Sequence, residues 1–321
     1  MKTKLLFAAL LSTTANAYAS CGSSFCAVNT YWDSQGLVND EGLRIDLRYS
    51  YARADTPRIG SSKVTNDPAL AAPGDEVENM RTINQLLNVD FDYAINHQWS
   101  VAVGLPLVMR DHAHTIAPAT VEQRNFTELG DIRVVGNYRF DSDDHLSGSG
   151  VRFGLKLPTG STGWELVPGS GPAERSLQPG SGSTDVILGA YYHQDVANSP
   201  WGWFVSGQLQ TAINTRNDYR PGNDVALDLG AHYTLSPALT GLLQLNAQFK
   251  ERDSGLNANP HSGVNSLSLS PGVSFAVAPQ TRLYGFVQLP IYQYANSDPA
   301  GSPYGQLTAP WSLSLGIRQT F

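Results

Sequence analysis

Apolar and polar residues alternate with a period of two in short segments along most of the chain. In the last segment, residues 307–321, every second position from Trp311 to Phe321 is apolar except Gln319, and the positions between them are small or polar. Such alternation is typical of a strand with one apolar and one polar face. The chain is therefore expected to end in a β-strand.

Eleven further segments alternate in the same way, at 43–51, 87–94, 99–107, 132–140, 151–157, 186–192, 201–209, 225–233, 243–250, 267–275 and 283–294. The segment 283–294 is less regular, because Tyr284, Phe286 and Tyr292 put aromatic side chains on its second face. Helical periodicity is absent beyond the first twenty residues. The sequence therefore predicts an all-β fold of about twelve strands.

Short and long connections between these segments alternate along the chain. Those at 96–98, 141–149, 195–200, 235–240 and 277–280 are short, whereas those at 52–80, 110–127, 158–183, 212–223, 251–264 and 294–306 are long and polar. Short turns at one end and long loops at the other are typical of outer-membrane barrels. The pattern predicts an antiparallel transmembrane β-barrel with long external loops and both termini in the periplasm. A soluble β-sandwich is the alternative, but it gives no reason for this sorting of loops.

The N-terminus predicts export. Lys2 and Lys4 precede an apolar run, and the small residues Ala17 and Ala19 follow as alternative cleavage sites, with Ala19 preferred. We expect a signal peptide at residues 1–19, a periplasmic segment with a cysteine pair at 20–41 and a transmembrane barrel at 42–321. A C-terminal Phe resembles the signal that such barrels present to their assembly machinery. The predicted partners are therefore this machinery and lipid, and the predicted location is the outer membrane of a Gram-negative bacterium.

Composition narrows the function. The formal net charge is −7 and becomes two units more negative when Lys2 and Lys4 are removed, which argues against a nucleic-acid partner. Mean hydropathy is slightly negative at −0.23, although aromatic residues make up 10%. This combination fits a barrel with a polar interior.

The predicted inward face carries twelve charges that we expect to line the lumen and to contribute to its selectivity. A ladder of ion pairs that only fills the lumen is the alternative. The residues are Arg44, Asp46, Arg48, Asp90, Asp92, Asp131, Arg133, Arg139, Arg152, Lys156, Asp228 and Arg318.

Two further groups of residues have candidate chemistry. Cys21 and Cys26 are the only cysteines, and in an oxidising periplasm they predict a disulfide, with a metal site or a redox role as alternatives. Asp111, His112 and His114, on a predicted external loop, are weak candidates for a divalent metal site, with solvation as the alternative. We predict no cofactor and no enzymatic activity.

Several motifs resemble the putative MetA-pathway phenol-degradation family of outer-membrane proteins. They include Gly130–Arg133, Gly154–Gly160, Gln178–Asp185, Tyr219–Asn223 and Gln288–Tyr294. The resemblance covers roughly residues 40 to 321 and implies a transporter-like β-barrel, often suggested to act on aromatic compounds.

The predicted function is an outer-membrane channel for small solutes, with aromatic or hydrophobic compounds as the suggested permeants. One alternative is a structural barrel whose N-terminal segment plugs the lumen or binds a periplasmic partner. The other is an outer-membrane hydrolase that would use His112, His114 or His261 near the rim.

Overall fold

A computed structural model describes residues 28–37, 42–140, 142, 146–169, 171–216 and 218–321. The predicted signal peptide and the Cys21–Cys26 pair lie outside the described residues. Within them, helical structure is limited to three short 3-10 turns, η1 (Trp32–Gln35), η2 (Pro68–Leu70) and η3 (Arg175–Leu177), and no helix is long and apolar enough to cross a membrane.

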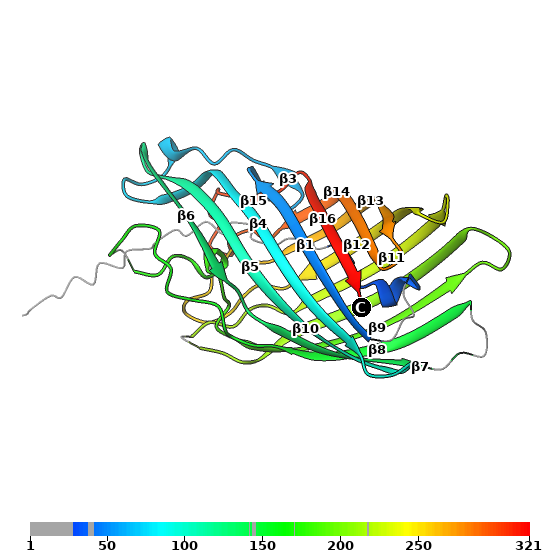
Figure 1. The fold of residues 1–321 in the computed structure, drawn as a ribbon. Coiled ribbons are helices and arrows are strands. Elements are labelled where there is room, and N and C mark those ends of the chain that lie inside the picture. Colours follow the sequence, from blue (N-terminus) through cyan, green and yellow to red (C-terminus); the bar gives the residue numbers. More distant parts are fainter. Residues whose placement is uncertain (1–27, 38–41, 141, 143–145, 170, 217) are drawn as a thin grey trace, which may run out of the picture.

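Twelve antiparallel strands close into a barrel, which confirms the predicted fold class (Figure 1). β1 pairs with β4 on one side and with β16 on the other, so the first and last strands of the sequence lie side by side. Around the barrel the strands are β1 (Gly42–Ala54), β4 (Glu76–Ala94), β5 (Trp99–Ile116), β7 (Arg133–Phe140), β8 (Ser147–Lys156), β9 (Thr184–Asp195), β10 (Trp201–Asn214), β11 (Asp224–Thr234), β12 (Leu239–Lys250), β13 (Val264–Ala278), β14 (Thr281–Ala295) and β16 (Ser312–Thr320).

The alternation of connection lengths follows the prediction. Short connections join β4 to β5, β7 to β8, β9 to β10, β11 to β12 and β13 to β14 at one end, called here the turn end. The longer connections meet at the opposite end, called the loop end, where β2 (Thr56–Ile59), β3 (Ser62–Lys63) and β15 (Gln306–Thr308) form a separate small sheet. The periplasmic orientation of the termini stays a prediction.

The outer face of the barrel carries a belt of exposed apolar side chains. On β16, for example, Leu315 is 48% exposed and Ile317 is 39% exposed, whereas the next residue, Arg318, is buried inside the barrel. Aromatic pairs lie near the turn end, with ring centroids 4.8 Å apart for Trp99–Tyr138 and 4.7 Å for Trp201–Tyr233. An apolar belt flanked by aromatic residues is the surface that a bilayer requires of a barrel.

Strand boundaries differ from the prediction at the loop end. The closing strand is shorter than 307–321, because Pro310 cannot continue a ladder, and residues 306–308 pair with β2 instead. The predicted loops 52–80 and 110–127 contain strand: β4 begins at Glu76, and β5 continues to Ile116 and turns back as β6 (Thr120–Leu129). β4, β5 and β6 consequently extend past their neighbours at this end (Figure 1).

The irregular segment 283–294 has a structural explanation. Tyr284 and Phe286 of β14 point into the barrel and are buried, as the pattern predicts. Tyr284 lies over Gly316 of β16, where an added Cβ would come within 2.2 Å of its ring. Tyr292, in contrast, is 48% exposed on the outer face, because the β13–β14 register shifts near Leu267 and reverses the alternation. The prediction that Tyr292 shares a face with Tyr284 and Phe286 is therefore wrong.

Candidate functional site: the barrel lumen

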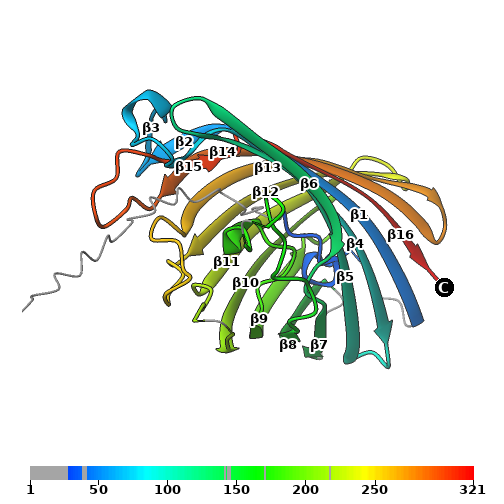
Figure 2. The ribbon, with the colours of Figure 1, turned by 90° about the vertical axis from the view of Figure 1, so that its left-hand side faces the viewer.

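Residues 28–37, called here the plug, lie inside the ring of strands near the turn end (Figure 2). Asn29 donates to the Ser206 hydroxyl at 2.8 Å and to Asp228 at 3.1 Å, and its carbonyl accepts from Gln244 at 2.9 Å. These partners come from β10, β11 and β12. The plug is thus held to one wall of the barrel by a chain of hydrogen bonds.

The opposite wall holds the plug by charge. Arg44 of β1 donates to both carboxylate oxygens of Asp33, at 3.0 and 3.2 Å, and also to Asp92 at 2.8 Å. Arg139 of β7 lies 3.6 Å from Asp33, and the guanidinium of Arg152 lies 3.8 Å from the centre of the Tyr31 ring. Bidentate arginine–carboxylate pairs combine strength with fixed geometry. Contacts on both walls mean that the plug spans the lumen.

An apolar cluster completes the attachment. Trp32 of η1 is 3% exposed and packs edge-on against Tyr284, with ring centroids 4.9 Å apart, next to Phe286 and Leu242. The inward aromatic residues of β14 therefore serve to receive the plug. Gly36, which ends η1 in a left-handed conformation (φ 71°), lies so close to His193 that an added Cβ would be 2.6 Å from Nδ1.

At the loop end a second segment, residues 174–183 and called here the strap, folds over the lumen. Leu177 packs with Phe126 and Trp164, and Arg110 of β5 donates to the Ser176 carbonyl at 2.7 Å. Gln178 holds the same loop together through hydrogen bonds to both main-chain groups of Trp164. Burial raises the pKa of the Glu174 carboxyl well above its usual range, although the Ser176 hydroxyl donates to it.

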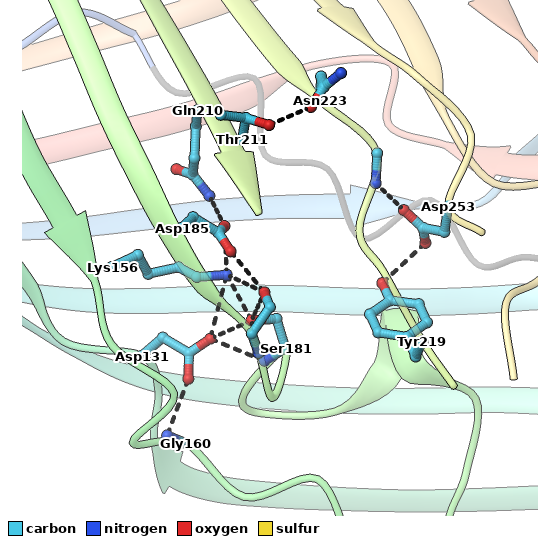
Figure 3. A network of polar contacts seen from close by, with 12 residues as sticks. Asp131, Lys156, Gly160, Ser181, Asp185, Gln210, Thr211, Tyr219, Asn223 and Asp253 are labelled. Carbon is cyan, nitrogen blue, oxygen red and sulfur yellow. Dashed lines mark hydrogen bonds and ion pairs between the residues drawn. The ribbon is translucent and has the colours of Figure 1, made fainter. Parts of the chain in front are cut away.

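A buried ionic network fixes the end of the strap to the barrel wall (Figure 3). The Lys156 ammonium lies 2.7 Å from Asp185 and 3.6 Å from Asp131, and it donates to Ser181 at 2.5 Å. Asp131 also accepts from the main-chain N–H groups of Gly160 at 3.0 Å and Ser181 at 2.8 Å. The Gly154–Gly160 and Gln178–Asp185 motifs are therefore joined in space and have a structural role.

Between the plug and the strap lies a cavity of about 430 Å³. Strands β4, β5 and β7 contribute aliphatic side chains together with charged ones such as Asp90, Asp92 and Arg133, whereas β8 to β12 and the neighbouring loops contribute polar and charged groups. The apolar residues are Leu86, Ala102, Pro106, Val108 and Val135. The facing residues include Lys156, Asp185, Gln210, Asp224, Gln248 and Lys250.

The structure places the twelve predicted charges inside the barrel. Ten line the cavity, and the other two, Arg139 and Asp228, contact the plug instead. Several are ion-paired or hydrogen-bonded, as in the Lys156 network, whereas Arg133 is exposed to the cavity. Their role in selectivity stays a prediction.

The predicted metal site at residues 111–114 is wrong in two respects. Its residues lie on a strand and not on a loop, and Asp111 does not face the two histidines. Asp111, His112 and His114 lie on β5, and alternation turns Asp111 away from the histidines, toward Arg81 and Gln123.

His261 does not form a serine–histidine pair with its neighbour Ser262. The Ser262 hydroxyl donates to the Asn259 carbonyl at 2.6 Å, and His261 instead lies 3.5 Å from Asp298.

The plug residues Asn29, Tyr31, Trp32 and Asp33 were not predicted as site residues. The available signal was an aromatic and charged stretch in the segment before the first strand, together with unexplained inward aromatics on β14.

The closed barrel, its apolar belt and its polar lumen define an outer-membrane β-barrel, which confirms the predicted location. The chain belongs to the family described as "Putative MetA-pathway of phenol degradation", whose profile matches residues 54–293. This confirms the predicted resemblance. No curated protein matches the chain in a sequence search.

A solved outer-membrane channel has the same fold. The COG4313 outer membrane channel from Pseudomonas putida F1 aligns with a TM-score of 0.64 at 12% identity, covering 92% of this chain and 100% of that one. The KdgM porin aligns at 0.44 and 9% identity, covering 87% and 99%, and the P. putida toluene transporter TodX at 0.45 and 6%, covering 89% and 92%.

Proposed function

We propose that the protein is a gated outer-membrane channel for small solutes that combine an apolar ring with a polar group. The observation that carries this proposal is the cavity between the plug and the strap, which is lined by both aliphatic and polar side chains. Its volume of about 430 Å³ falls within the range of roughly 300–1,000 Å³ that small-molecule sites occupy. The aliphatic side chains can pack against a ring, and the polar side chains can form hydrogen bonds with a hydroxyl or an acid group.

The charges of the cavity support a solute recognised by its ring rather than by its net charge. Nine cationic and eight acidic side chains line the cavity, so the summed charge is close to neutral. A strong excess of one sign would favour ions of the opposite sign. A near balance of charge together with aliphatic lining residues favours amphipathic solutes, and simple phenols, to which the family description refers, have this character.

The plug favours a second candidate role, a barrel that is closed at rest and responds to a partner. In this proposal the turn end faces the periplasm, and a periplasmic partner would act on the N-terminal segment. Catalysis is not part of the proposal, since Ser262 and His261 are directed to different partners.

Uptake into proteoliposomes tests the channel proposal. The probe is 4-hydroxybenzenesulfonate, whose permanent charge limits leakage through lipid, compared with glucose of similar size. We expect Leu86→Gln to lower the ratio of aromatic to sugar uptake by at least about fivefold, because the apolar contact of one side chain contributes on the order of 1–3 kcal/mol and about 1 kcal/mol corresponds to a factor of five. Leu256→Gln, at an exposed loop position, is the control.

An unchanged ratio in Leu86→Gln, or wild-type protein that admits neither solute, would contradict this proposal.

A further inference from the structure

Four side chains that the lumen does not use converge at the loop end. Glu76 and Glu78 lie at the start of β4, and His112 and His114 lie near the end of β5. Between the pairs Val77–Thr115 and Arg81–Ala113, β4 advances four residues while β5 advances two. This irregularity re-aims side chains, as β-bulges do. It brings both glutamates to the two histidines.

The distances between their ligand atoms fit a metal ion. His112 Nε2 lies 3.3 Å from Glu78 Oε1 and 3.1 Å from His114 Nδ1, while His114 Nδ1 lies 3.0 Å from Glu76 Oε1 and 3.5 Å from Glu78 Oε1. All four ligand atoms lie within 4.8 Å of one another. A tetrahedron with metal–ligand bonds of about 2.0–2.1 Å has edges of roughly 3.3–3.4 Å. The four distances given above lie on both sides of that value.

Burial adds an independent argument. Glu78 and His112 are fully buried, and His114 is 1% exposed. Neither carboxylate oxygen of Glu78 has a hydrogen-bond partner among the described residues, and its contacts are those with the histidine nitrogens. A buried carboxylate without hydrogen bonds is costly unless a cation neutralises it. Glu78 is thus a fully buried polar group aimed at the point where the other three ligands meet.

The second ring nitrogen of each histidine has a hydrogen-bond partner, as is usual for histidines that ligate a metal. His112 Nδ1 lies 2.9 Å from the Thr82 hydroxyl, and His114 Nε2 lies 3.3 Å from Glu122 Oε2 of β6. A carboxylate behind a ligating histidine fixes the orientation of its ring and raises its basicity. Both rings therefore present the inner nitrogen to the centre of the cluster.

We propose that Glu76, Glu78, His112 and His114 form a binding site for a divalent transition-metal ion of the Zn²⁺ class. Two imidazole nitrogens with two carboxylate oxygens suit zinc better than calcium or magnesium, which prefer oxygen ligands alone in larger number. With four protein ligands, three of them buried, the site has no open coordination position, as in structural zinc sites. The ion would join β4 to β5 next to Arg110, which holds the strap through the Ser176 carbonyl.

Zinc binding by the full-length mature protein tests this site. The protein, carrying Cys21→Ser and Cys26→Ser to remove thiol ligands, is stripped with a chelator and dialysed against Zn²⁺. We expect one tightly bound Zn²⁺ per chain, and Glu78→Gln should weaken binding by more than about 100-fold. Loss of the outer carboxylate in Glu122→Gln should weaken it by roughly 10–100-fold. His261→Gln, at another buried histidine paired with an aspartate, should retain wild-type affinity.

Wild-type protein that binds no zinc, or Glu78→Gln that binds it as tightly as wild type, would overturn the proposal. If the variants fail to fold, Co²⁺ in the stripped wild-type barrel decides the question. The intense visible absorption of tetrahedral cobalt, with histidine scattering in X-ray absorption, is expected. Octahedral cobalt without histidine ligands would show that the cluster does not bind the ion and would overturn the proposal.

Discussion

Trp32→Ala should raise the open probability of the channel in planar bilayers by at least about tenfold. Trp32 is the main apolar anchor of the plug, and truncation of a buried tryptophan costs roughly 3–5 kcal/mol. Even 3 kcal/mol corresponds to a shift of about 100-fold in an equilibrium. The barrel wall should stay intact, because Tyr284 and Phe286 remain on β14.

The matched control is Trp203→Ala, which removes a tryptophan that is 40% exposed on the outer face of β10. It should leave the open probability unchanged. Equal conductance in wild type and Trp32→Ala, with both migrating as compact barrels in unheated gels, would mean that the plug does not limit conduction.

Lys156→Met should lower the stability of the barrel by about 3–5 kcal/mol, since removing one partner of a buried ion pair leaves uncompensated charge. Asp185 is 2% exposed, and Asp131 lies in the same network. The measurement is the temperature at which the compact form in detergent converts to the unfolded form. Lys156→Met with Asp185→Leu should recover part of the loss, because both charges of the closest pair are then absent.

Arg81→Met is the control for Lys156→Met. It breaks the Arg81–Asp111 pair, at 3.4 Å and about one quarter exposed, and exposed pairs contribute only about 0–1 kcal/mol. Equal losses in Arg81→Met and Lys156→Met would show that the Lys156 network contributes no more than a surface pair.

The fold could be predicted in outline because alternation and loop sorting are local properties of the sequence. Twelve alternating segments gave the number of strands, and the inward charges lie inside as expected. Boundaries were less accurate where tertiary contacts decide them. The Glu76 end of β4 and residues 108–116 of β5 do not alternate apolar and polar residues, because both faces of this extension meet other parts of the protein.

The site could be predicted only in part, for a related reason. Hydrogen bonds of Asn29 join residues that are 177 and 199 positions apart in the chain. No local pattern reports such a pairing. Likewise His112 and His114 are visible as a pair in the sequence, but the register irregularity in β4 selects Glu76 and Glu78, rather than the adjacent Asp111, as their carboxylate partners.

The most direct test of the gated channel is a reversible tether on the plug. Asn29→Cys and Ser206→Cys, in a chain with Cys21→Ser and Cys26→Ser, replace two side chains in hydrogen-bond contact at 2.8 Å. The oxidised, disulfide-tethered protein should admit almost no 4-hydroxybenzenesulfonate into proteoliposomes, and reduction of the same sample should restore uptake. Equal uptake before and after reduction, with the disulfide verified by mass spectrometry, would contradict a lumen gated by residues 28–37.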